Sequence, residues 1–245
     1  DAGSAKILEM LGYEAIATTS SGHAATLGRL DGGVSREEAL AHAATLVAAV
    51  SLPVSADLEH GFSDDAAGVA ETISLALSTG LAGCSIEDST GNAEEPIFEK
   101  GRALERVEAA VEAARRGGGT FVLTARAENY LHGRSDLSDT ISRLQAFEEA
   151  GADVLYAPGM KDLAEIRELV VSVGLPVNVL VRPGGPIVAE LAEIGVRRIS
   201  VGGAFAYAGF GALVEAATEF RDSGTYGVSV LAGEGSAAAR GAFGP

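Results

Sequence analysis

Acidic side chains follow several short apolar runs of this chain. Asp57 and Glu59 close the second run, Glu87 closes the third, and the fourth leads into Arg126 and Glu128. Because residues two apart on a strand share a face, Asp57 and Glu59 are expected to point inward together. Carboxylates crowded at one rim need a compensating cation, and oxygen ligands alone favour a hard ion such as Mg²⁺. The pattern therefore predicts a magnesium site beside an arginine, whose planar fork suits an anionic substrate group.

A segment of small polar residues follows the first apolar run. Residues 18–23 read Thr-Thr-Ser-Ser-Gly-His, and their hydroxyl and backbone N–H groups could hold a carboxylate. Read singly, each of these strand-end carboxylates is equally consistent with a helix cap or a salt bridge at the rim. The combination of this turn, the acidic strand ends and one arginine is what favours a site for a metal and an anion.

Seven apolar runs of strand length alternate with helix-like stretches. The predicted strands are Ala15–Thr18, Val54–Asp57, Cys84–Glu87, Phe121–Ala125, Val154–Ala157, Val177–Val181 and Ile199–Val201. Apolar residues at helical spacing predict helices over Arg36–Val50, Asp65–Ser78, Leu104–Arg115, Asp139–Ala150, Lys161–Val173 and Ile187–Ile194. Ser35 and Glu38 have the spacing of a capping box. This order indicates an α/β fold of parallel strands joined by crossover helices.

A closed (β/α)₈ barrel needs about eight strands, one more than these runs supply. The chain opens at Asp1 with a helical pattern that reaches Leu11, so we expect the first barrel strand to precede residue 1. An open doubly wound sheet is the alternative. We assign residues 1–224 to the barrel and residues 225–245 to a Gly/Ala-rich C-terminal extension, of which residues 233–245 are expected to be mobile.

The composition excludes several classes of protein. The 245 residues are 47% hydrophobic, carry a formal net charge of −16 and include one Cys. One Cys cannot form an internal disulfide or a thiolate cluster, which excludes a disulfide scaffold and favours a reducing compartment. The acidic charge lacks the basic footprint of nucleic-acid binding, and no apolar stretch approaches the ~20 residues that cross a bilayer. We therefore expect a cytoplasmic protein with no nucleic-acid or membrane partner.

Six short motifs, in their order along the chain, resemble the isocitrate lyase and phosphoenolpyruvate mutase superfamily. They read Asp1-Ala-Gly-Ser-Ala, Thr19-Ser-Ser-Gly, Leu30-Asp-Gly, Ala56-Asp-Leu-Glu-His-Gly-Phe, Ser85-Ile-Glu-Asp-Ser and Thr124-Ala-Arg-Ala-Glu. The resemblance runs from Asp1 to about Gly224. It implies a (β/α)₈ barrel whose last helix is exchanged between neighbours, giving a homo-oligomer built as a dimer of dimers. It also implies a Mg²⁺ cofactor, replaceable by Mn²⁺, and a 2-oxo acid or phosphonate substrate.

The resemblance assigns metal ligands to four acidic residues. Asp57 matches the direct ligand, which also contacts substrate. The positions that hold the metal largely through water are matched by Asp31, Glu59 and Glu87. The resemblance thus agrees with the carboxylate pattern of the strand ends and adds Asp31 to it.

Further residues match the substrate-binding positions of the superfamily. Ser21, Gly22 and the backbone of His23 match the turn that binds the substrate carboxylate. Arg126 matches the catalytic arginine that binds the anionic group, and Glu128 is the catalytic-site residue beside it. A metal and an arginine together would stabilise negative charge developing on an enolate oxygen.

The loop over residues 90–102 departs from the superfamily's lyases. They carry Lys-x-Cys-Gly-His there, whereas this loop has no cysteine, and Asn92 is its candidate catalytic group. Cleavage of isocitrate or methylisocitrate by the usual route is therefore not expected. Cys84 is expected to be an inert core thiol. Pro158 stands at the strand end where mutases place a His and methylisocitrate-cleaving enzymes a Glu.

These observations predict a Mg²⁺-dependent enzyme that makes or breaks a C–C or P–C bond of a small 2-oxo acid, such as oxaloacetate or phosphonopyruvate. The reaction would pass through an enolate-like intermediate. Two alternatives remain open: an aldolase-like or hydroxymethyl-transferring barrel, and a non-catalytic protein that binds an oxo acid. The missing loop cysteine and Pro158 motivate the second alternative.

Overall fold

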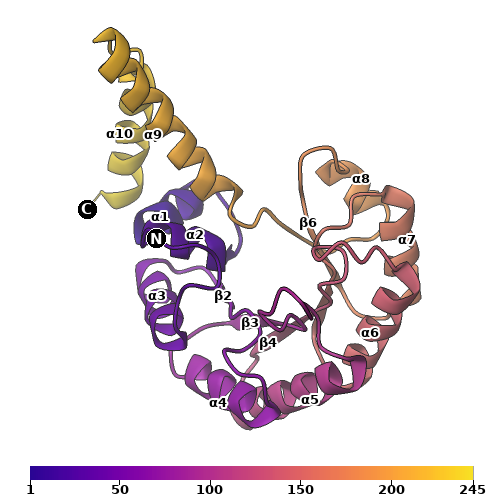
Figure 1. Ribbon diagram of the computed structural model, residues 1–245. Coiled ribbons are helices and arrows are strands. Elements are labelled where there is room, and N and C mark those ends of the chain that lie inside the picture. Colours follow the sequence, from indigo (N-terminus) through magenta and orange to yellow (C-terminus); the bar gives the residue numbers. More distant parts are fainter. Residues whose placement is uncertain (245) are drawn as a thin grey trace.

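Figure 1 shows a computed structural model of the chain, which describes residues 1–244. A curved sheet of parallel strands runs in chain order from β1 to β7, with the crossover helices on its outside. The strands are β1 (Ile16–Ala17), β2 (Val54–Asp57), β3 (Gly83–Glu87), β4 (Val122–Arg126), β5 (Val154–Tyr156), β6 (Val177–Leu180) and β7 (Arg198–Ser200). The helices are α1 (Ala2–Met10), α2 (Ser20–Thr26), α3 (Arg36–Ala49), α4 (Ala66–Leu77), α5 (Lys100–Arg116), α6 (Leu137–Glu149), α7 (Leu163–Ser172), α8 (Val188–Glu193), α9 (Ala204–Ser223) and α10 (Ser229–Phe243).

The sheet is a nearly closed barrel rather than a doubly wound sheet. A doubly wound sheet changes strand order at a switch point and carries helices on both faces, whereas here the strand order is sequential. Over residues 1–244, β1 and β7 form the two edges and do not pair with each other. The α/β fold and its parallel strands are confirmed, and a strand before residue 1 stays a prediction.

Every predicted strand and helix overlaps an observed one, and the differences lie at the ends. The capping box is present: Ser35 Oγ accepts the N–H of Glu38 at 3.2 Å, and the Glu38 carboxylate accepts the N–H of Ser35 at 2.9 Å. Apolar spacing did not predict α9, α10 or α2, and α2 lies where the sequence indicated a turn. Its residues lack an apolar stripe, and its first turn is stabilised by Thr19, which accepts the N–H of Gly22.

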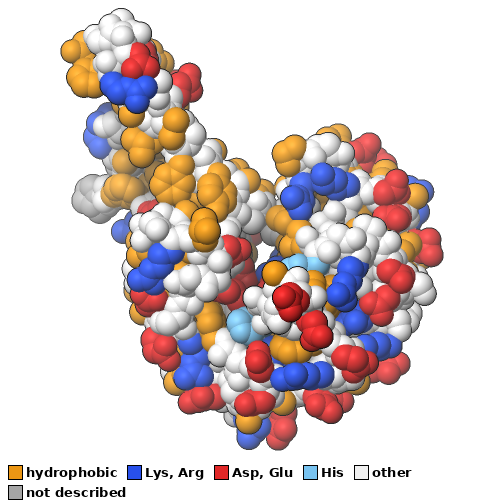
Figure 2. Space-filling model, in the orientation of Figure 1, with side chains coloured by type: hydrophobic (Ala, Val, Ile, Leu, Met, Phe, Trp, Pro, Cys, Tyr) orange, Lys and Arg blue, Asp and Glu red, His pale blue; other side chains and the backbone are white. Residues whose placement is uncertain are grey.

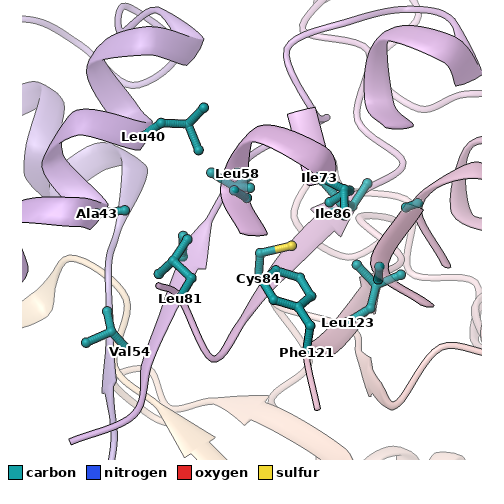
Figure 3. Packing of buried hydrophobic residues seen from close by; sticks show 14 of the residues in the cluster. Leu40, Ala43, Val54, Leu58, Ile73, Leu81, Cys84, Ile86, Phe121 and Leu123 are labelled. Atoms are coloured by element: carbon teal, nitrogen blue, oxygen red, sulfur yellow. The ribbon is translucent and has the colours of Figure 1, made fainter. Parts of the chain in front are cut away.

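Apolar side chains fill the space between the sheet and the outer helices. Figure 3 shows part of this core, in which Leu58 and Cys84 lie among side chains from several neighbouring elements. Cys84 is fully buried, and burial raises the pKa of its thiol above the ordinary value. The prediction of a core thiol is therefore confirmed. Within residues 1–244, no helix is long and apolar enough to cross a membrane.

The C-terminal helices α9 and α10 extend away from the barrel (Figure 1). Neither contains a buried residue, and apolar side chains gather along this arm in Figure 2, among them Leu213 at 63% exposure and Val214 at 65%. Residues 233–243 belong to α10, a helix that the sequence analysis did not predict, and the expectation that they are mobile stays a prediction. Alanine-rich sequence favours helix, and α10 continues to Phe243, whose ring approaches Gly3 of α1.

Replacing Ser35 by Ala is expected to destabilise the protein by about 1 kcal/mol, because the first turn of α3 loses its side-chain acceptor. Thr45→Ala is the matched control, since it removes a hydroxyl from the middle of the same helix, where Thr45 donates to the carbonyl of Ala41. The free energy of unfolding from urea titrations measures both variants. Equal losses in the two would contradict a capping role for Ser35.

Candidate functional site

Arg126, the last residue of β4, lies at the centre of the acidic cluster. Its Nη1 contacts Asp57 Oδ1 at 3.0 Å, its Nη2 contacts Glu87 Oε2 at 2.9 Å, and its Nε contacts Glu128 Oε1 at 2.9 Å. The side chains of these four residues are between 3% and 18% exposed. Neighbouring parallel strands bring them together, because register pairs Glu87 with Arg126 and places β2 next to β3. The predicted convergence on one arginine is present for Asp57, Glu87 and Glu128. Glu59 lies in a turn after β2 with φ 49°, so strand alternation does not align it with Asp57 as expected.

The cluster carries more negative charge than Arg126 neutralises. Although burial opposes it, the three carboxylates hold the pKa of Arg126 well above its ordinary value. Burial raises the pKa of Glu87 well above its usual range, against the effect of Arg126 and with that of the nearby carboxylates. Burial, with the charges of Asp57 and Asp31, raises the pKa of Glu59 to about 7. A further cation would relieve this repulsion.

The turn that opens α2 supplies the hydrogen bonds expected for an anion. The N–H and hydroxyl of Ser20 donate to Asp57 Oδ2 at 3.2 and 3.0 Å, and the N–H of Asp57 donates to Thr18 Oγ1 at 2.9 Å. A Cβ added at Gly22 would lie 2.6 Å from Cγ2 of Thr19, so glycine permits the tight packing of this turn. The turn therefore already donates hydrogen bonds to one carboxylate, that of Asp57.

The donor set fits Mg²⁺ better than a metal that needs several protein ligands. Asp57, Glu59 and Glu87 offer only oxygen atoms, which hard cations prefer. Over residues 1–244, no three acidic, His or Cys side chains converge as a ready ligand set. Mg²⁺ keeps several waters and takes only one or two carboxylates, so it does not require such a set. The carboxylate arrangement therefore fits a Mg²⁺ ion that Asp57 binds directly and that the other carboxylates bind through water molecules.

Comparison with known proteins identifies the family. The family model for phosphoenolpyruvate phosphomutase matches residues 1–221. The chain belongs to the phosphoenolpyruvate mutase and isocitrate lyase superfamily.

Three relatives of the superfamily are similar over much of the chain. The crystal structure of a Burkholderia cenocepacia J2315 protein, described as a lyase or mutase without a stated substrate, is 52% identical with a TM-score of 0.96 and covers 100% of this chain and 89% of its own. The 2-methylisocitrate lyase of Escherichia coli K12 is 31% identical over 72% of this chain, which spans 61% of the lyase. A phosphonopyruvate hydrolase in complex with oxalate and Mg²⁺ is 25% identical with a TM-score of 0.82, covering 94% of this chain and 82% of its own.

The residues that match the superfamily's carboxylate-binding turn lie on α2. Ser21 Oγ is 3.2 Å from Thr19 Oγ1, and the ring of His23 stacks on that of His42 at 3.7 Å between centroids. His23 and His42 line a small cavity of about 10 Å³ together with Asp57 and Glu59. The structure therefore places this turn next to the acidic cluster.

Two predicted site residues lie outside the cluster. Asp31 is exposed on the loop before α3 and acts on Glu59 only through its charge. Asn92 is exposed in the segment after β3, where its side-chain oxygen accepts the N–H of Glu94. Asn92 lines a different cavity of about 290 Å³ with Phe98, Arg102 and others. In this conformation of the segment, the structure does not bring Asn92 to Arg126.

Sequence analysis missed three residues that contact or support the cluster. The guanidinium of Arg126 lies 5.1 Å from the ring centre of Tyr156, and Arg143 of α6 pairs with Asp88 at 3.2 Å. Burial raises the pKa of Asp88 to about 7, although the N–H of Glu128 and the charge of Arg143 oppose the shift. A signal for Arg143 was present: it is a charged residue on the buried face of α6, among Thr140, Leu144 and Phe147.

Glu59→Gln is expected to raise the melting temperature of the metal-free protein at pH 8. The folded-state pKa of Glu59, about 7, lies above its ordinary value of 4.5, so its ionised form disfavours the fold. The penalty is absent below pH 4.5 and grows as the pH rises through 7, so the gain at pH 8 should vanish at pH 4. Glu105→Gln, an exposed change on α5, is the control. Thermal unfolding with chelator present measures both, and a lower melting temperature for Glu59→Gln at pH 8 would contradict the argument.

Proposed function

We propose that this chain is a Mg²⁺-dependent enzyme that makes or breaks a C–C or P–C bond of a small 2-oxo acid through an enolate-like intermediate. The observation that carries the proposal is the position of Arg126, held among carboxylates of neighbouring strands and beside the N-terminal turn of α2. Substrates of this class carry a carboxylate and a carbonyl, and these groups need hydrogen-bond donors and positive charge.

The residues divide into a metal side and a substrate side. Asp57 would hold the metal directly, and Asp31, Glu59 and Glu87 would hold it through water. Mg²⁺ would supply positive charge to the carbonyl oxygen of the substrate. Metal binding would give a function to the carboxylates whose charge Arg126 does not neutralise.

On the substrate side, Arg126 and the turn of Ser21, Gly22 and His23 would bind the anionic groups. Glu128 is 3% exposed and contacts Nε, so it fixes the plane of the Arg126 guanidinium. Donors fixed in this way stabilise charge that develops during the reaction without reorganising.

The range of possible reactions is narrowed because two catalytic side chains of related enzymes are missing. The segment from Thr90 to Arg102 contains no cysteine, and Pro158, buried in the turn after β5, offers no acid or base. A hydrolytic or decarboxylating reaction on an oxo acid such as oxaloacetate or phosphonopyruvate needs neither group, because water can act as the nucleophile or proton source. Asn92 would reach the substrate only if its segment closes over the cluster.

Mg²⁺ and oxalate together are expected to raise the melting temperature. Oxalate resembles the enolate of a 2-oxo acid, and a ligand at about 100 times its dissociation constant stabilises a protein by about 2.7 kcal/mol, or roughly 5–10 °C here. Asp57→Asn should abolish this shift. Asp153→Asn, which alters an aspartate before β5 that pairs with Arg115, should keep it.

The outcomes separate three functions. A shift that needs both Mg²⁺ and oxalate, followed by turnover of oxaloacetate or phosphonopyruvate in an NMR assay, supports the enzyme. A shift with no turnover of any oxo acid favours the non-catalytic binding protein, and exchange of C3 protons only with an aldehyde favours the aldolase-like enzyme. The absence of any shift contradicts the site.

We also propose that α9 is exchanged between subunits of a homo-oligomer, with a dimer of dimers as the full assembly. Monomers rarely expose apolar patches as long as the one on α9 and α10, which includes Phe205, Leu213 and Phe220. The exposed Ile187 and Val188 at α8 offer an apolar surface on the barrel for a partner's helix.

Leu213→Glu is expected to convert the oligomer to smaller species, because it buries a charge in the proposed interface. Leu75→Glu on α4, another exposed leucine, is the control. Size-exclusion chromatography with light scattering gives the masses. A wild-type protein that is monomeric at micromolar concentration would contradict helix exchange. It would leave the proposed reaction unaffected.

A further inference from the structure

A buried ion pair joins the ends of β3 and β4 to α6. Asp88 is 2% exposed and Arg143 is 8% exposed, and Arg143 Nη1 donates to Asp88 Oδ2 at 3.2 Å. Neither residue faces the small cavity beside Asp57, so neither is placed to touch a substrate there. Such a pair gains little net stability, because removing two charges from water offsets much of their attraction. The role of this ion pair therefore lies in the backbone and side chains that it holds in place.

Asp88 connects the two carboxylates that contact Arg126 from β3 and β4. It follows Glu87 directly in the chain, and its Oδ1 accepts the N–H of Glu128 at 2.8 Å. Its own N–H donates to the carbonyl of Arg126 at 3.2 Å. Asp88 therefore sets the distance between the backbones of Glu87 and Glu128, and with it the position of Arg126 between them.

Arg143 holds Asp88 and the end of the following segment at the same time. Its Nη1 also donates to the carbonyl of Phe98 at 2.8 Å, and its Nε donates to Asp139 Oδ2 at 2.8 Å. The N–H of Phe98 in turn donates to the carbonyl of Asp88 at 2.8 Å. The segment from Asp88 to Phe98, which carries Asn92, is thus closed at its base and bonded to α6.

We propose that Arg143 is a positioning residue of the site: through Asp88 it fixes the Glu128 peptide and the Arg126 guanidinium, and through Phe98 it fixes the base of the segment that carries Asn92. The inference rests on the proposed function, because it assumes that Arg126 binds the substrate. A lysine cannot replace Arg143 fully, since one ammonium on a flexible stem does not reproduce the planar fork that meets Asp88, Phe98 and Asp139 together.

The test compares Arg143→Lys and Arg143→Met with Arg115→Met. Arg115 is a structural arginine away from the site, and its side chain is 47% exposed against 9% for Arg143. It pairs with Asp153 at 2.7 Å and donates to the carbonyl of Gly151, at the opposite end of β4. Two quantities are measured in each protein, the affinity for oxalate in saturating Mg²⁺ by calorimetry, and the hydrogen–deuterium exchange of residues 126–131.

Arg143→Met is expected to bind oxalate about 10–100-fold more weakly than wild type, with faster exchange at residues 126–131. Arg143→Lys should show a smaller loss of affinity. Arg115→Met should lower the melting temperature while oxalate affinity and exchange at residues 126–131 stay as in wild type. If Arg143→Met does not fold, Asp139→Ala, which removes the acceptor of Arg143 Nε while leaving the pair with Asp88, takes its place.

Combining Arg143→Met with Glu128→Gln separates positioning from general destabilisation. If Arg143 acts through Glu128, the second change should cost little once the first is made. Additive losses, equal effects of Arg115→Met, or unchanged affinity and exchange in Arg143→Met would each overturn the proposal. If wild type itself binds no oxalate, the proposed function fails, and the exchange measurement alone still decides whether Arg143 fixes the Glu128 peptide.

Discussion

The contact on which the site depends is that of one guanidinium with carboxylates from neighbouring strands. Arg126 is 12% exposed, and its Nε, Nη1 and Nη2 each face a carboxylate oxygen at 2.9–3.0 Å. Because both kinds of charge are largely removed from water, neither can be deleted without leaving the other unpaired. Arg126 therefore limits where β2, β3 and β4 can end relative to one another, and the rest of the site is arranged around that limit.

The parallel barrel brings the strand ends that surround Arg126 together through its regular alternation of strands and helices. Crossover helices return the chain so that every strand runs in one direction, and the carboxyl ends of all the strands meet at one rim. The capped helices α3, α4 and α6 set the return paths, and α2 starts at the rim with donors directed at Asp57. The ion pair of Asp88 with Arg143 then ties the rim to the outer layer.

Most of the fold and the centre of the site could be predicted from the sequence. Alternating apolar runs indicated each strand and most helices, and the carboxylates near Arg126 followed from their place at strand ends. The predictions that failed depend on a local cap, on tertiary contacts and on composition. The helical state of α2 depends on a cap rather than periodicity, and the roles of Arg143 and Asp88 depend on partners 55 residues apart. The helical C-terminus was missed because its glycines disfavour helix, although its alanines favour it.

Two features of the chain, the surplus of carboxylates at the rim and the apolar surface of α9, lie next to each other in the structure. The rim holds more carboxylates than Arg126 balances, and α9 exposes apolar side chains to water. The start of α9 lies against the turn of α2, since a Cβ at Gly203 would come within 2.9 Å of Ser21 Oγ and one at Gly22 within 3.3 Å of Ala206 Cβ. Any partner that fixes α9 therefore also fixes the turn whose donors face the rim. If α9 is exchanged between subunits as proposed, any coupling between subunit association and anion binding would run through this contact and would be reciprocal.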